Sequence, residues 1–115
     1  MFNDIASITM QQALGGLAAR QRVIADNIAN IETPSYLAGR VLFEDALRSA
    51  VGAGTPGQAT STVERSLEPT GLNGNNVNLD HETLANVDTG LRYQLMLKAL
   101  DSKYGLLHDA IRGGS

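Results

Sequence analysis

The sequence predicts a mainly α-helical protein in which two long helices, one at each end of the chain, pair as a coiled-coil-like hairpin. Apolar residues recur every three or four positions in residues 4–31 and again in residues 79–111, which is the period of a helix face. Between them, residues 52–76 are rich in Gly, Thr, Ser, Asn and Pro, and predict a flexible, mostly irregular loop with room for a short strand near residues 62–67. The 115 residues are enough for one modest domain, residues 1–115.

The first expected helix, residues 4–31, carries an apolar seam with alternating spacings of three and four. The members of this seam are Met10, Leu14, Leu17, Ile24, Ile28 and Ile31, with Gln21 at the position where the apolar pattern lapses. Such a seam is typical of helices that pair side by side. Arg22 and Asp26 stand four positions apart and can form an ion pair. The neighbouring residues Gly15 and Gly16 weaken the helix and indicate a bend or a close contact with another backbone.

Residues 25–36, ADNIANIETPSY, end this helix abruptly. The residue before a proline is pushed out of the helical region, so Thr33 should be extended. Asn30 can adopt a left-handed conformation or bond to free carbonyls at the helix end. The simplest interpretation is that the amides of Asn27 and Asn30 terminate the helix.

Residues 32–51 contain this turn and then a short amphipathic element in which Phe43, Leu47 and Val51 recur every four positions. The second long helix, residues 79–111, carries two apolar stripes. The first consists of Leu84, Val87, Leu91 and Leu95, and the second of Tyr93, Leu97, Leu100, Tyr104, Leu107 and Ile111. Because the stripes are offset, their apolar arc is too wide for one neighbouring helix. We therefore expect other subunits to complete the core, and the isolated chain to be partly disordered.

Composition and motifs argue against catalysis. The net charge of −3 comes without a basic run, so nucleic acid is not expected as a partner. The chain has no cysteine, which excludes thiol and disulfide chemistry. His81 beside Glu82, and His108 beside Asp109, lack the two-ligand spacing of a metal-binding helix and are interpreted as solvated residues near helix ends. No nucleophile motif or phosphate loop occurs. We expect no enzyme activity, cofactor, metal or small-molecule substrate.

Targeting signals are also missing from the sequence. The N-terminus, MFNDIASITMQQAL, lacks the cationic start and continuous apolar run of a secretory signal peptide. No window approaches the roughly 18 uninterrupted apolar residues that a membrane span needs. We therefore expect a chain that is not membrane-spanning and has no cleaved signal.

Three segments resemble the flagellar rod and hook proteins, a family of axial proteins. RQRVIADNIANIETPSY (residues 20–36) is similar to their N-terminal signature, in which a helix ends in an Ala-Asn-x-x-Thr-Pro-Gly-Tyr turn, with Ser35 here in place of the usual glycine. GNNVNLDHE (residues 74–82) resembles the Gly-Asn-Asn-Val-Asp-Leu-Glu-x-Glu element of small proximal-rod proteins. LRYQLMLKALDSKYGLLHDAI (residues 91–111) resembles their C-terminal helix. Only the loop lies outside the resemblance.

The resemblance implies a structural subunit of the proximal rod of the bacterial flagellar basal body. In this family the terminal helices pair into the inner layer of a hollow tube, and neighbouring subunits cover their apolar faces. The implied partners are other rod proteins, the junction with the base ring and export gate, and copies of the chain itself. The implied route is export of the unfolded chain from the cytoplasm by the flagellar type III apparatus, without a cleaved signal, to the rod in the periplasmic space.

Two alternatives remain open at this point. A second small proximal-rod protein shares the first two motifs, but it usually has a longer middle and a different terminal helix. From another class of protein, a soluble helical secretion adaptor or chaperone would also use long amphipathic helices, although it has no need of the turn motif.

The resemblance also supplies candidate site residues. As subunit-interface residues we expect Leu14, Leu17, Ile24, Asn27, Ile28, Asn30, Thr33, Pro34, Tyr36, Asn75, Asn76, Leu97, Leu100, Tyr104, Leu107 and Ile111. FEDAL (residues 43–47) resembles the Phe-x-x-x-apolar export-gate motif of rod and hook subunits, which makes Phe43 and Leu47 its candidates. An ordinary apolar pair that packs within the rod explains the same spacing.

Overall fold

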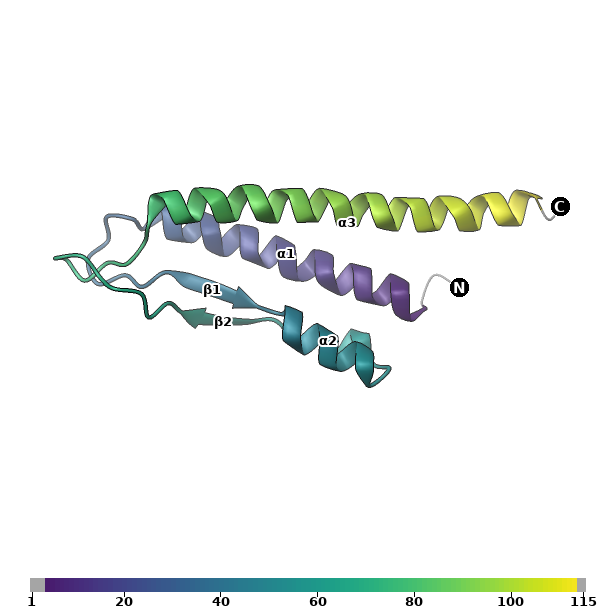
Figure 1. The fold of residues 1–115 in the computed structure, drawn as a ribbon, viewed down its shortest axis with the longest axis horizontal. Coiled ribbons are helices and arrows are strands. Elements are labelled where there is room, and N and C mark those ends of the chain that lie inside the picture. Colours follow the sequence, from purple (N-terminus) through teal and green to yellow (C-terminus); the bar gives the residue numbers. More distant parts are fainter. Residues whose placement is uncertain (1–3, 114–115) are drawn as a thin grey trace.

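The computed structural model describes residues 4–113, apart from the side chains of Leu107 and Ala110. The molecule measures 67 × 27 × 14 Å, and its radius of gyration of 17.9 Å exceeds the value of about 13 Å expected for a compact domain of this length. A hairpin of two long helices forms one side, and a small sheet with a short helix lies along the other (Figure 1). The chain is therefore an elongated rod, and the mainly α fold with paired terminal helices is confirmed.

Helix α1 (Ile5–Ala29) begins at a side-chain cap. The backbone N–H of Ser7 donates to Asp4 Oδ1 at 2.8 Å, and Lys103 of the other long helix lies 2.9 Å from Asp4 Oδ2. The hydrogen bond from the Ser7 backbone, and to a smaller extent that from Lys103, lower the pKa of Asp4 from 3.8 to about 2. The start of α1 is thus fixed both to its own first turn and to its partner helix.

Helix α3 (Leu79–Gly113) has 35 residues and is about 52 Å long. The side chain of Asn78 caps it by accepting from the backbone N–H of His81 at 3.1 Å. Asp88 and Arg92 form the expected ion pair four positions apart, at 3.0 Å. The corresponding pair expected on α1, between Arg22 and Asp26, is not formed within residues 4–113.

The two long helices run antiparallel. At one end Asn27 donates to Glu82 at 3.1 Å, and toward the other end Gln11 donates to the hydroxyl of Tyr104 at 3.0 Å. The last turns of α3 continue past the start of α1 without a partner helix (Figure 1). The pairing therefore leaves one end of α3 uncovered by its own chain.

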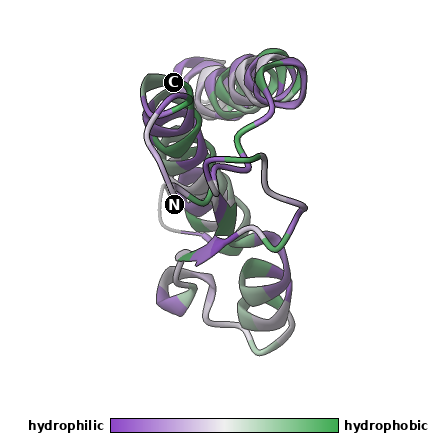
Figure 2. Cartoon of the chain, turned by 90° about the vertical axis from the view of Figure 1, so that its left-hand side faces the viewer, coloured by the Kyte–Doolittle hydropathy of each residue, from purple (hydrophilic) through white to green (hydrophobic). Residues whose placement is uncertain are grey.

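Only part of the expected apolar seam of α1 is buried. Leu17 and Ile24 are each 4% exposed, Met10 and Leu14 are half-buried, and Ile28 is 36% exposed. On α3, the first expected stripe points to solvent, with exposed fractions of 57–69% for Leu84, Val87, Leu91 and Leu95. Viewed along the long axis, hydrophobic and hydrophilic residues are interleaved around the helices (Figure 2). The wide apolar arc of α3 is therefore present, and one partner helix does not cover it.

The middle of the chain forms a second layer. Strand β1 (Gly39–Leu42) pairs antiparallel with strand β2 (Thr62–Arg65), with helix α2 (Glu44–Gly52) and a 3-10 turn, η1 (Pro56–Gln58), between them. The short strand expected near residues 62–67 is confirmed. The amphipathic element expected after the turn divides into β1 and α2, because a four-residue strand is too short to show its alternation in the sequence.

A small core joins the two layers. It consists of Ala13, Leu17, Val41, Phe43 and Leu47, contributed by α1, β1 and α2 and by the link between them. The ring of Phe43 lies on Gly16, where a Cβ atom would overlap it, whereas a Cβ on Gly15 would meet no atom within 4 Å. Gly16 is therefore required by packing inside the chain, and Gly15 is not. No helix among the described residues is long and apolar enough to cross a membrane.

The two adjacent glycines provide a matched pair of substitutions. Gly15→Ala should stabilise the chain by about 1 kcal/mol, because alanine favours an exposed helix interior. Gly16→Ala should destabilise it by about 1–2 kcal/mol, since displacing the Phe43 ring costs more than the helix gains. The midpoint of the urea transition, followed by circular dichroism, measures both effects. Equal shifts in one direction would contradict the packing of Phe43 on Gly16.

Candidate functional site

Asn27 joins three elements at the closed end of the hairpin. Its side chain is fully buried; Oδ1 accepts from the N–H of Gly39 at 2.8 Å, and Nδ2 donates to the Gly39 carbonyl at 3.0 Å. Nδ2 also donates to Glu82 Oε2 at 3.1 Å, and the hydroxyl of Tyr36 donates to Oδ1 at 3.4 Å. One amide thus satisfies both its donor and its acceptor groups while tying α1 to β1 and to the first turn of α3.

Glu82 is a buried carboxylate, 1% exposed, with partners on both oxygens. Oε2 accepts from Asn27, and Oε1 lies 2.7 Å from Arg40 Nη1 on β1. A buried charge is tolerated only when it is paired and hydrogen-bonded. The interpretation of Glu82 as a solvated residue is therefore wrong, although His81 beside it is exposed as expected. Glu82 corresponds to the final glutamate of the proximal-rod element, which was the one sequence signal for its importance.

The turn after α1 is built by short side chains. Asn30 Nδ2 donates to the carbonyl of Asp26 at 2.8 Å, and the hydroxyl of Thr33 donates to Asn30 Oδ1 at 3.0 Å. Asn30 has φ of −107° and is therefore not left-handed. Its side chain instead bonds to a carbonyl at the helix end, that of Asp26, which also accepts from the backbone N–H of Asn30 at 3.1 Å. The left-handed residue is Ser35, with φ of 60°. The Asn30 amide therefore helps to end α1, as expected, and this is one of the functions of the amides in this site.

A segment far along the chain docks onto this turn. Asn75 Nδ2 donates to the carbonyls of Asn30 and Thr33, each at 2.8 Å. Asn76 Oδ1 accepts from the N–H of Ala38 at 2.7 Å, while its Nδ2 donates to two carbonyls just after β2. Both asparagines are buried. The turn and the segment before α3 therefore form a single hydrogen-bonded head, which we call the asparagine head: Asn27, Asn30, Asn75 and Asn76 with Glu82.

Two positive-φ residues face each other in the asparagine head. Gly74 has φ of 79°, and a Cβ placed on it would lie 3.1 Å from the Ser35 hydroxyl oxygen. The backbone N–H of Ser35 donates to the carbonyl of Asn73 at 2.8 Å. The conformation that a glycine adopts freely is therefore held here by a serine, which carries the steric cost of a left-handed side chain.

The expected interface residues divide into three groups. Buried within the chain are Leu17, Ile24, Asn27, Asn75 and Asn76; half-buried are Leu14, Asn30, Tyr36, Leu100 and Tyr104; exposed are Ile28, Thr33, Pro34, Leu97 and Ile111. The side chain of Leu107 lies outside the described residues. The structure thus brings the expected amides together in the asparagine head and leaves part of the apolar set on the surface. The expected export-gate residues Phe43 and Leu47 are buried in the core.

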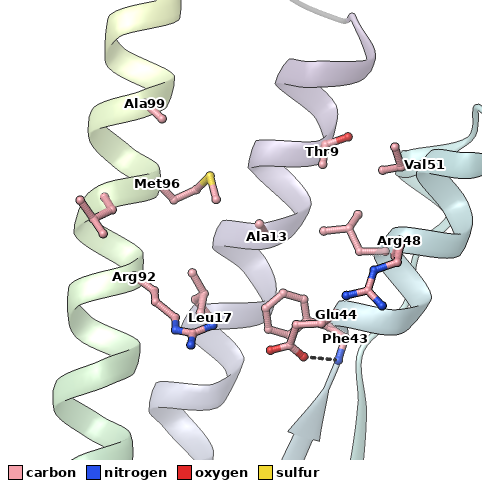
Figure 3. Close-up of a pocket in the computed structure, with 12 residues that line it drawn as sticks. Thr9, Ala13, Leu17, Phe43, Glu44, Arg48, Val51, Arg92, Met96 and Ala99 are labelled. Carbon is pink, nitrogen blue, oxygen red and sulfur yellow. Dashed lines mark hydrogen bonds between the residues drawn. The ribbon is translucent and has the colours of Figure 1, made fainter.

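An apolar groove opens between α1, α2 and α3 (Figure 3). Its volume is about 550 Å³, and apolar side chains such as Leu17, Phe43 and Met96 line it, with Arg48 and Arg92 also at its walls. No pattern in the sequence predicts this groove, because it depends on where α2 lies against the hairpin. Among the described residues, no group of three or more His, Asp or Glu side chains could hold a metal ion.

Comparisons with known proteins identify flagellar rod proteins as relatives of this chain. The chain is 30% identical over 133 residues to the flagellar basal body rod protein FlgB of Salmonella typhimurium LT2, covering 97% of this chain and 96% of that protein. It is also 30% identical to FlgB of Escherichia coli K12, with the same coverage, and 28% identical to FlgB of Bacillus subtilis 168, covering 91% and 92% of the two chains. No family model matches the chain.

Removing the bridging amide should loosen the whole head. Asn27→Ala leaves the buried Gly39 groups and Glu82 short of partners, so we expect a loss of about 3 kcal/mol in the free energy of unfolding. Asn27→Asp should be similarly harmful despite its shape, because it places a second carboxylate against Glu82. Asn86→Asp, an exposed position on α3, is the control. A midpoint of urea unfolding unchanged in Asn27→Ala would contradict the bridging role.

The strained turn gives a second pair of variants. Ser35→Gly should stabilise the chain by about 1 kcal/mol, because glycine adopts positive φ without the steric cost of a side chain. Gly74→Ala should destabilise it, since the new Cβ is both strained by its φ and pressed against Ser35. Urea unfolding of the two single variants and the double variant measures these effects. Loss of stability in Ser35→Gly would show that the hydroxyl outweighs the strain.

Proposed function

The chain belongs to the FlgB family of flagellar basal body rod proteins, and from this premise we propose that it is a structural subunit of the proximal rod. Of the two small proximal-rod proteins whose motifs it shares, the relatives support FlgB over FlgC. The 97% coverage includes both long helices and the asparagine head. Membership makes the chain a structural component of the flagellum, and its place within the rod is the proposal.

Self-assembly through the terminal helices is the second part of this proposal. The observation that carries it is the exposed apolar row Leu84, Val87, Leu91 and Leu95 of α3, of which Leu95 also borders the groove between α1, α2 and α3. A row of large apolar side chains on a soluble rod is typical of a surface that another protein covers. Three of the residues expected at the interface add exposed apolar area: Ile28 on α1, and Leu97 and Ile111 on α3. Other rod proteins and copies of the chain are the proposed neighbours.

The exposed part of the turn, with Thr33 and Pro34, is the proposed contact of the asparagine head. The buried amides beneath it serve to hold that surface in shape. We propose that one end of the elongated chain lies at the junction with the base ring and export gate, in the periplasmic space.

We further propose that the chain reaches the rod by flagellar type III export without a cleaved signal, with Phe43 and Leu47 as the export-gate motif. Both side chains are buried in the folded chain, so the export apparatus would meet them only before folding. This is consistent with export of an unfolded chain, and packing in the core gives the same two residues a second use after export.

Deletion of the chain in its own bacterium tests the rod assignment. We expect cells without it to lose swimming and to form no complete rod, and a plasmid copy to restore both. Isolated basal bodies should contain the protein. Complete rods in the deletion strain would overturn the proposal.

Thermal unfolding of the purified chain distinguishes the function of a rod subunit from that of a secretion chaperone. Because the apolar faces of a lone rod subunit stay uncovered, its thermal transition should be broad. A chaperone should instead be a stable dimer with a cooperative transition. A sharp, cooperative transition of a dimer would favour the chaperone.

Export is tested by a substitution and a matched control in the same core. Phe43→Ala should hold the chain in the cytoplasm, because the aromatic residue of the motif is lost. Leu17→Ala weakens the same core by about 2–5 kcal/mol but should be exported normally, since folding follows export. The amounts of chain inside and outside the cytoplasm measure both. Equal export of the two variants would remove the assignment of the motif.

A further inference from the structure

The unpartnered face of α3 occupies one defined stretch of the helix. Leu84, Val87, Leu91 and Leu95 recur at spacings of three and four, so they form one row. Glu82 and Thr89, each 1% exposed, mark the opposite side of the helix, which is covered by α1. We call this row the α3 ridge. It ends where Lys98 and Ser102 replace apolar residues, so the surface has a definite beginning and end.

Helix α1 has an outer face of a different kind. Its other sides lie against α3 and against the layer of β1 and α2, and the outward row is Gly15, Ala18, Arg22 and Ala25, which we call the α1 track. Except for Arg22 its side chains are small, so another helix can approach the backbone closely. Among the described residues, Gly15 has no neighbour that requires a glycine. A close contact with another subunit would give a reason for its cost to helix stability.

The ridge and the track lie at the same height along the hairpin. Gln21 of α1 lies beside Gly90 of α3, and Gln11 is hydrogen-bonded to Tyr104. Because both antiparallel helices rise about 1.5 Å per residue, moving along α1 toward its start from the Gln21–Gly90 contact corresponds to moving forward along α3 by the same number of residues. A second copy placed alongside without an axial shift brings Leu95 to the height of Gly15.

The same placement sets the remaining pairs. Leu91 comes to the height of Ala18, and Leu84 to the height of Ala25. The three leucines of the ridge thus each meet a small residue of the track, the complementarity that close helix packing requires, while Val87 comes to the height of Arg22.

The charges on the two surfaces are complementary in this placement. Arg22 lies in the middle of the track, is exposed, and has no ion-pair partner among residues 4–113. Asp88 borders the ridge at the same height, and its one ion pair within residues 4–113 is with Arg92 of its own helix, at 3.0 Å. A carboxylate can accept from two guanidinium groups. The neighbouring copy therefore offers Arg22 a partner.

We propose that the α3 ridge of one copy packs against the α1 track of a second copy, without an axial shift, with Arg22 of the track facing Asp88 of the ridge. This inference rests on the proposed self-assembly and names the surfaces that carry it. Ridge and track are different surfaces, so the contact is heterologous and leaves each copy with one free ridge and one free track. Repetition of the contact builds a ring or a helical wall rather than a closed pair.

Cross-linking between copies tests the geometry, and the absence of native cysteines makes the result unambiguous. Two single variants, Gly15→Cys and Leu95→Cys, are produced together in swimming cells and mildly oxidised. We expect a disulfide-linked dimer with both together and none with either alone. Gly15→Cys with Ser102→Cys, two turns farther along α3, is the negative control. Swimming cells whose rods contain both variants but give no cross-link would overturn the inference and leave the proposed function standing.

A charge exchange tests the same contact without cysteines and covers the case in which those variants do not swim. Arg22→Glu and Asp88→Arg should each abolish swimming, because like charges then face one another across the contact. The double variant should regain it. Normal swimming of Arg22→Glu, or no recovery in the double variant, would overturn the inference. Absence of the chain from purified basal bodies would instead overturn the proposed function.

Discussion

The arrangement of the whole molecule depends on one buried hydrogen-bonded chain, from Asn27 through Glu82 to Arg40. A seam of leucine and isoleucine tolerates a slip of one helical turn, because one apolar residue replaces another at nearly the same height. A buried carboxylate does not tolerate it, since a slip would leave the charge without partners. The Asn27 amide therefore sets the height of α3 relative to α1, and through Gly39 it also sets the start of β1.

This polar constraint compensates for a small apolar core. Among the described residues, only a few apolar side chains of the two layers are buried, and the last turns of α3 extend past α1 without a partner helix. Hydrophobic burial within one chain is therefore modest, while hydrogen bonds in the asparagine head are numerous and each contributes only about 1 kcal/mol net. A chain with this balance has a well-defined geometry at one end, and the proposed contacts with neighbouring subunits would supply much of its remaining stability.

The sequence predicted the long helices well because their signal repeats over many turns. The observed bounds, Ile5–Ala29 and Leu79–Gly113, lie within two residues of the expected ones, and the offset stripes correctly indicated too much apolar surface for one partner. Partners of the amides could not be predicted in this way. Asn27 bonds to residues 12 and 55 positions away, so nothing in its local sequence distinguishes a bridging amide from a helix cap. For the same reason the burial of Glu82 was missed.

The division between polar contacts inside and apolar surfaces outside has a consequence for assembly. If the contacts within one chain and the proposed contacts between chains were both apolar, one kind could replace the other. A partly folded chain could then pair with a neighbour through the wrong face. Glu82 opposes this, because any other seating of α3 on α1 would leave its buried charge without Asn27 and Arg40. The α3 ridge is then presented at a fixed height beside the outer face of α1. In the proposed assembly, the asparagine head thus sets the height at which two copies would meet, and the leucines of the α3 ridge would supply the free energy of the contact.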